Sequence, residues 1–146
     1  MNLLDQKHTR RLQEIVTRHG WPGKSLVGGD GAHAAWLLVQ HATHDVPFMA
    51  QCLGLMGEAV RRGEASAKDW ALLTDRVRVK QGQPQLYGNS FTLSVDGKLT
   101  ADPIEDAANL DARRKSIGLP PFAEYERKLR EAYGLGPALP SASPKP

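Results

Sequence analysis

One stretch decides the fold: Asp30-Gly-Ala-His-Ala-Ala-Trp-Leu-Leu-Val-Gln-His-Ala-Thr-His-Asp45. At 3.6 residues per turn it predicts a helix over residues 30–44 that is apolar around most of its circumference. The exception is one polar stripe, which carries His33, Gln40, His41 and His44. A helix of this kind belongs in a core, so we expect its stripe to meet partner side chains or to line a cavity.

The flanking segments predict further helices at about 5–19, 45–62, 66–79, 103–117 and 122–133. Asp45 and Ser66 have the character of N-caps, and Asp102-Pro-Ile-Glu105 is a strong helix-start pattern. Phe91–Val95 alternates with period two before Asp96-Gly97, which predicts a β-hairpin that Gln85–Tyr87 could extend. The predicted fold is mainly α: about six helices packed around the 30–44 helix, with a small hairpin inserted near residues 85–100.

Length and composition indicate one ordinary soluble domain over residues 1–133, followed by a Pro/Ser/Ala-rich tail, 134–146, that we expect to be disordered. The net charge is +3, with 19 Lys and Arg interleaved with 16 Asp and Glu. Arg61-Arg62 and Arg113-Arg114-Lys115 are therefore interpreted as solvated faces, and nucleic-acid binding is not expected.

The single cysteine, Cys52, excludes an internal disulfide and fits a reducing compartment. The N-terminus is too polar for a secretory signal, and no apolar run approaches the roughly 20 residues that span a bilayer. We therefore expect a cytoplasmic protein without a membrane segment.

The histidines are the first candidates for chemistry. His41 and His44 lie about 4.5 Å apart along a helix axis, so both could reach one substrate or one metal ion. His33 lies about 16 Å from His44, too far to share a ligand with it on a straight helix. The pattern leaves three interpretations open. His41 and His44 could bind a metal ion, His41 could act in acid/base catalysis or in ligand binding, or the histidines could be purely structural. The pattern identifies no cofactor.

Polar residues on two other segments could complete such a site. Asp75 could orient a histidine, and Arg76 could hold a carboxylate or phosphate through two hydrogen bonds. In the segment Gln85-Leu-Tyr-Gly88, Tyr87 could offer its hydroxyl to a cavity. The structural alternative is a salt-bridge network between helices together with a tyrosine anchor.

Several segments, taken together and in this order, resemble a family of small bacterial proteins that is defined only as a domain of unknown function. They are His19-Gly-Trp-Pro22, Gly31–Ala42, Leu72-Leu-Thr-Asp-Arg-Val77, Gln85-Leu-Tyr-Gly88, and Asp111–Tyr125 with its Arg113-Arg114 and Gly118-Leu-Pro-Pro121. The chain departs from the family pattern at Asn89-Ser90, where the family has Thr-Gln. The resemblance implies no established activity.

Two functional hypotheses follow, and the sequence leaves open whether the protein is an enzyme. In the first, a pocket binds a small polar or anionic ligand, with histidine acid/base catalysis as an option. His41 and Asp75 would be its catalytic residues, and its binding residues would be Gln40, His44, Arg76, Gln85 and Tyr87. In the second, the protein is a non-enzymatic interaction module, such as an immunity-type or regulatory partner of another protein.

Overall fold

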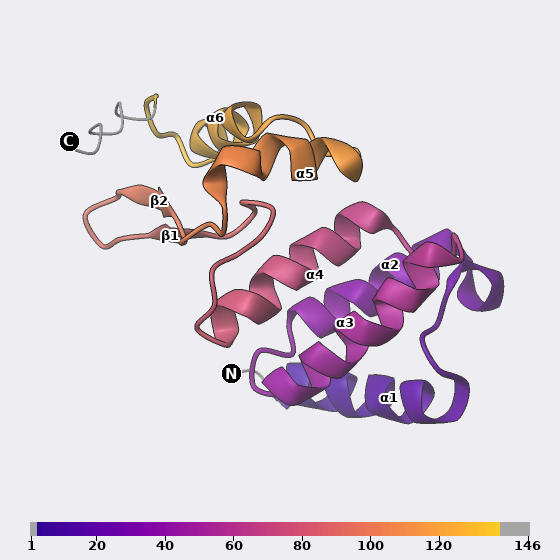
Figure 1. Ribbon diagram of the computed structural model, residues 1–146. Helices are drawn as coiled ribbons and strands as arrows, with labels where there is room; N and C mark the ends of the chain where they lie inside the picture. The colour runs from indigo at the N-terminus through magenta and orange to yellow at the C-terminus, as the bar shows by residue number, and fades with distance from the viewer. Residues whose placement is uncertain (1–2, 138–146) are drawn as a thin grey trace.

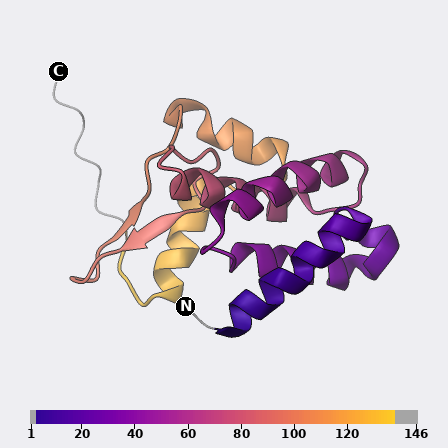
Figure 2. The same ribbon diagram turned by 90° about the horizontal axis from the view of Figure 1, so that it is seen from below.

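The computed structural model describes residues 3–137 and confirms the mainly α fold (Figure 1). Four N-terminal helices form one bundle, and the hairpin and two shorter helices follow it in the chain. Figure 2 shows the hairpin extending away from the helical body. No helix in residues 3–137 is long and apolar enough to cross a membrane.

The bundle consists of α1 (Leu3–His19), α2 (Lys24–Gln40), α3 (Val46–Arg61) and α4 (Ala67–Lys80). Two predicted caps are confirmed, because the Asp45 carboxylate accepts a hydrogen bond from the Phe48 amide and Ser66 Oγ accepts one from the Asp69 amide. The core between these helices is built from apolar side chains that include Trp36, Val39, Met49, Cys52, Met56, Leu73 and Val77. Their burial supplies the main stabilisation of the bundle.

Helix α2 is central, since it contacts α1, α3 and α4, but only one of its faces is buried. Its buried face carries Ala32, Ala35, Trp36 and Val39, while His33, Leu37 and His41 lie on an exposed side. The histidines of the polar stripe therefore lie on exposed positions, while Gln40 is buried. Because much of the expected apolar circumference is alanine and glycine, one stripe of contact is enough to bury Trp36 and Val39.

The ends of α2 also differ from the prediction. The helix begins at Lys24 instead of Asp30 and is interrupted at Gly28, whose φ of 77° and ψ of 169° are not helical. It ends at Gln40, so that His41 is its C-cap and His44 lies in the following turn. The early start is held by Glu64, whose carboxylate accepts hydrogen bonds from Ser25 N at 2.7 Å and Ser25 Oγ at 2.5 Å.

The hairpin is confirmed as β1 (Phe91–Leu93) paired antiparallel with β2 (Leu99–Ala101), with Thr92 opposite Thr100. Gly97 adopts the left-handed conformation in the connecting loop, at φ 82°. Gln85 does not extend the hairpin. It forms an isolated parallel bridge with Ile104, beyond β2.

The helix predicted over residues 103–117 is wrong in its first part. A 3₁₀ turn, η1 (Ala107–Asn109), leads into the short α5 (Leu110–Ser116). The expected cap, Asp102, instead accepts hydrogen bonds from Ser90 Oγ and Thr92 Oγ1, and the Pro103 carbonyl accepts one from Gln85 N. Tertiary pairing of this segment therefore outweighs its local helix-start pattern.

The last helix, α6 (Phe122–Ala132), packs on the hairpin through Phe122, whose ring stacks on Phe91 at 5.9 Å. The helix ends before Tyr133, which the prediction includes in it, and Tyr133 is 56% exposed. Most of the tail predicted to be disordered, residues 138–146, lies outside the described residues. The single-domain boundary at residue 133 stays a prediction.

Candidate functional site

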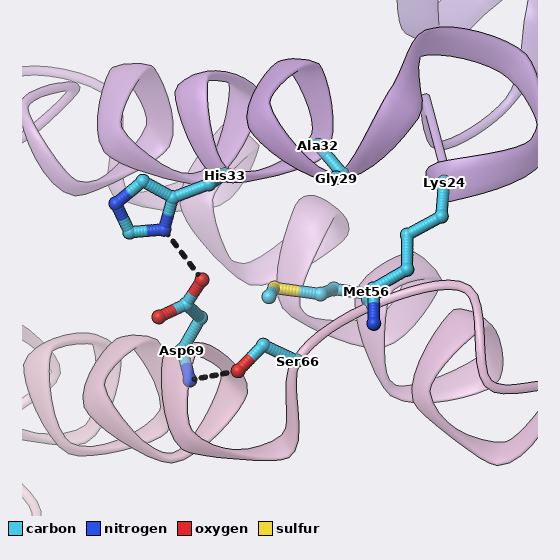
Figure 3. Close-up of a pocket in the computed structure, with 8 residues that line it drawn as sticks. Lys24, Gly29, Ala32, His33, Met56, Ser66 and Asp69 are labelled. Atoms are coloured by element: carbon cyan, nitrogen blue, oxygen red, sulfur yellow. Dashed lines mark hydrogen bonds and ion pairs between the residues drawn. The ribbon is translucent and has the colours of Figure 1, made fainter.

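A cavity of about 250 Å³ lies between the N-terminal halves of α2 and α4, with α3 behind it (Figure 3). It is lined by Lys24, Gly29, Ala32, His33, Met56, Ala65, Ser66 and Asp69. Met56, Ala32 and Ala65 are buried and give it an apolar floor. The polar groups stand around this floor, as in most small-molecule sites.

His33 and Asp69 form the one histidine–carboxylate pair among the described residues. His33 Nδ1 lies 2.8 Å from Asp69 Oδ2, and the side chains are 52% and 16% exposed. The His33 ring also lies against Trp36, with 5.0 Å between the ring centroids. In Figure 3 the second ring nitrogen points away from Met56 and Lys24. A carboxylate on Nδ1 fixes the ring and its tautomer, which leaves Nε2 as the group that can exchange a proton.

Lys24 lines the cavity from the first turn of α2, and Figure 3 shows its side chain apart from the His33–Asp69 pair. This turn is separated from the rest of α2 by the break at Gly28, which lets it lean over the cavity. Among the described residues Lys24 makes no ion pair, and its backbone N–H donates to the Glu64 carbonyl at 2.9 Å. The cavity therefore has an unpaired cation on one side and a histidine–carboxylate pair on the other.

The predicted residues at the C-terminal end of α2 lie elsewhere. His41 and His44 are exposed, and Gln40 is buried with no hydrogen bond to its side-chain oxygen. Arg76 is exposed and donates from Nη1 to the Gln40 carbonyl at 3.2 Å, which satisfies a carbonyl in the last turn of α2. Within residues 3–137 no three histidine, cysteine or acidic side chains gather as a metal site.

Asp75 lies on α4 outside the cavity and contacts the chain segment that follows this helix. Its carboxylate is fully buried and accepts hydrogen bonds from three backbone amides, those of Leu86 at 2.9 Å, Tyr87 at 3.0 Å and Asn89 at 2.9 Å. Burial raises the pKa of Asp75, and the three amides lower it part of the way back. None of its hydrogen bonds goes to His41 or Arg76, so its role in orienting a histidine stays a prediction.

Gln85 and Tyr87 lie in the same segment that Asp75 holds. The Gln85 side chain is fully buried, donates to the carbonyls of Ser90 and Asp102, and accepts from Ser90 N. Tyr87 is 9% exposed and meets Trp70 edge to face, and burial raises the pKa of its hydroxyl. The structure thus brings Asp75, Gln85 and Tyr87 together, and it brings Arg76 to Gln40.

Arg113 and Arg114 donate hydrogen bonds to the backbone carbonyls of the segment whose amides bind Asp75. Their interpretation as a solvated face is therefore wrong. Arg113 Nε donates to the Leu86 carbonyl at 2.9 Å, and Arg114 Nη1 donates to the Tyr87 carbonyl at 2.5 Å. Arg114 is fully buried and lies over the Tyr125 ring, and burial lowers the pKa of its guanidinium. We call Asp75, Arg113, Arg114 and the segment 86–89 between them the backbone clamp.

Sequence reasoning missed His33–Asp69 and Arg114 for different reasons. His33 is set aside because it cannot share a ligand with His44, and Asp69 is not among the candidate residues. A signal for Arg114 does exist, since it lies one helical turn after Leu110, which is buried.

The model of a family of unknown function, DUF6624, matches residues 1–137. The chain therefore belongs to this family. No curated protein and no solved structure matches the chain.

Proposed function

We propose that this member of a family of unknown function binds a small polar molecule in the cavity between α2 and α4, with the His33–Asp69 pair as a polar recognition group. The observation that carries the proposal is the 2.8 Å contact between His33 Nδ1 and Asp69 Oδ2 at the edge of that cavity. A carboxylate held in place by a histidine is a fixed polar group that a ligand can meet. This revises the predicted site, because the proposed pair of histidine and carboxylate is His33–Asp69 instead of His41–Asp75.

The surroundings of the pair support a ligand of modest size. At about 250 Å³ the cavity is smaller than the roughly 300–1,000 Å³ of sites that hold drug-sized ligands. Its apolar floor can exclude water beneath a bound molecule, and Lys24 and Ser66 can fix the polar ends of that molecule. The proposed setting is the bacterial cytoplasm, whose reducing conditions suit the free, buried Cys52.

A second candidate is the interaction module, which is favoured by exposed apolar side chains near the start of α2. Leu26 and Val27, on the first turn of α2, are 59% and 44% exposed. Exposed apolar side chains are common where another protein docks. In this case the cavity would receive a side chain of the partner.

The test is a thermal-shift screen of the full chain against small carboxylates, amines, amino acids, sugars and phosphates. Binding raises the melting temperature by mass action. The matched variants are His33→Gln and His41→Gln, which make the same change at two exposed histidines of one chain segment. We expect a ligand that stabilises the wild type and His41→Gln but not His33→Gln.

Two results would overturn the proposal. If His41→Gln abolishes the stabilisation while His33→Gln retains it, the site lies at the C-terminal end of α2, as the sequence predicts. If no compound of the panel stabilises the wild type while a protein partner does so, the interaction module is correct. Far-UV circular dichroism of both variants checks that they remain folded.

A further inference from the structure

The cavity presents opposite charges at its two ends. Figure 3 shows Lys24 at one end and the His33–Asp69 pair at the other. The floor between them is apolar, with Met56 only 1% exposed. A ligand that fills this cavity must therefore satisfy a cation, an apolar middle and a carboxylate.

The Lys24 ammonium is available for an external anion. The carboxylate that adjoins it, Glu64, already accepts hydrogen bonds from both Ser25 N and Ser25 Oγ, and these bonds lower the pKa of Glu64. Lys24 also lowers the pKa of Glu64 by charge attraction, but the ammonium group forms no ion pair with Glu64 or with any other acid among the described residues. An ammonium group in this position can bind a carboxylate or a phosphate.

Asp69 keeps acceptor capacity beyond its contact with His33. A carboxylate can accept about four hydrogen bonds, and Asp69 Oδ2 uses one of these positions while its side chain stays 16% exposed. A neutral His33 that donates from Nδ1 leaves the negative charge of Asp69 in place. This end of the cavity therefore favours a group that brings its own protons and a positive charge.

We infer that the cavity takes a small zwitterion, with a carboxylate on Lys24, an ammonium group on Asp69 and a short alkyl spacer over Met56. The inference rests on the proposed function, because it names the ligand class of the same cavity. The Ser66 hydroxyl, which accepts from Asp69 N at 3.3 Å, can donate its own proton to the ligand.

The experiment measures affinities for a series of ω-amino acids, from glycine to 6-aminohexanoate, by isothermal titration calorimetry. Each member is compared with the alkyl carboxylate and the alkylamine of the same length. Hydrogen bonds to charged groups contribute enough that we expect one member of the series to bind roughly tenfold tighter than either single-ended analogue. The lengths that bind define the spacer.

Two variants assign the ends. Lys24→Met should reduce the affinity of the zwitterion to that of the matched amine, and Asp69→Asn should reduce it to that of the matched carboxylate. Lys80→Met removes an exposed lysine from α4 outside the cavity and should leave the affinity unchanged. If Asp69→Asn does not fold, the Lys24→Met comparison with amines and carboxylates still decides the orientation.

The inference and the proposed function can fail separately. If a carboxylate or an amine binds as tightly as the matched zwitterion, and His33→Gln still abolishes binding, the cavity is a site but its ligand is not a zwitterion. If no member of the series binds, the zwitterion is excluded, and the wider panel against His33→Gln and His41→Gln decides the site. If the zwitterion binds equally well to Lys24→Met, the assigned orientation is wrong.

Discussion

Replacing Asp75 tests the backbone clamp most directly. The Asp75 carboxylate receives three amide hydrogen bonds in a fully buried position, two at Oδ1 from Leu86 and Tyr87 and one at Oδ2 from Asn89. Asp75→Asn keeps the shape of the side chain and its Oδ1 acceptor. It places an NH₂ group opposite the Asn89 amide, so that two donors face each other.

The expected cost follows from that one lost acceptor. A buried donor left without a partner costs about 1–3 kcal/mol, so Asp75→Asn should lower the free energy of unfolding by about 2 kcal/mol. Asp75→Ala leaves all three amides unpaired and opens a small cavity, and should cost about 3–5 kcal/mol. Either loss is large beside the 5–15 kcal/mol that a domain typically has in total.

The pH dependence of Asp75→Asn follows from the same burial. Because burial raises the pKa of Asp75 in the folded state, the folded protein holds this proton more tightly than the unfolded chain does. The contribution of Asp75 to the free energy of unfolding is therefore greatest below the ordinary pKa of an aspartate, and it declines as the pH rises through the raised value. The difference between the wild type and Asp75→Asn should shrink over that interval.

Urea unfolding followed by far-UV circular dichroism measures these changes, with Asp30→Asn as the control. Asp30 is exposed and makes none of these hydrogen bonds, so its replacement should change the free energy of unfolding by no more than about 0.5 kcal/mol. Unfolding of Asp75→Asn within that same margin of the wild type would refute the reasoning. A stable Asp75→Asn that no longer binds a ligand of the wild type would instead place Asp75 in the binding site.

Three further predictions concern the backbone clamp and the core. Arg114→Lys should lower the free energy of unfolding by about 3 kcal/mol in the same urea assay, because one ammonium group cannot replace the three hydrogen bonds that the guanidinium donates. Gly88→Ala should cost about 2–4 kcal/mol, since Gly88 has a φ of 70° and an added Cβ would lie 2.8 Å from Phe122; Gly97→Ala, with a φ of 82° and open space, should cost only about 1 kcal/mol. Burial and the nearby Asp45 raise the pKa of Cys52 to about 12, so iodoacetamide should label it at pH 8 roughly a thousandfold more slowly in the native state than in urea, and comparable rates would show that the thiol is accessible.

The features that sequence predicts correctly depend on neighbouring residues. The capped helices α3 and α4 and the hairpin each carry their own start or turn signals, and the structure confirms all three. Asp102-Pro-Ile-Glu105 has signals of the same quality, yet it forms no helix start. Its polar groups pair with Gln85, Ser90 and Thr92, which are distant in the sequence, and local patterns contain no information about such partners.

The candidate site shows the same division. Helix rise predicts that His33 lies too far from His44 to share a ligand, but it cannot show that a carboxylate on another helix, 36 residues later, lies 2.8 Å from His33. Apolar content likewise predicts a central helix without predicting which of its faces stays open to solvent. Both errors concern the mutual orientation of helices, which is set by the packing of side chains far apart in the chain.

The backbone clamp holds the segment 86–89 by its peptide groups, with Asp75 on the N–H side and the two arginines on the C=O side. Peptide groups are the same for every amino acid, so these contacts select the number of residues between Asp75 and Arg114 more than their identities. Side chains such as Leu86 can therefore change while the segment keeps its place. Insertion or deletion of one residue there would shift every peptide group out of register with its partner, which makes this segment a poor position for a tag, a linker or a circular permutation.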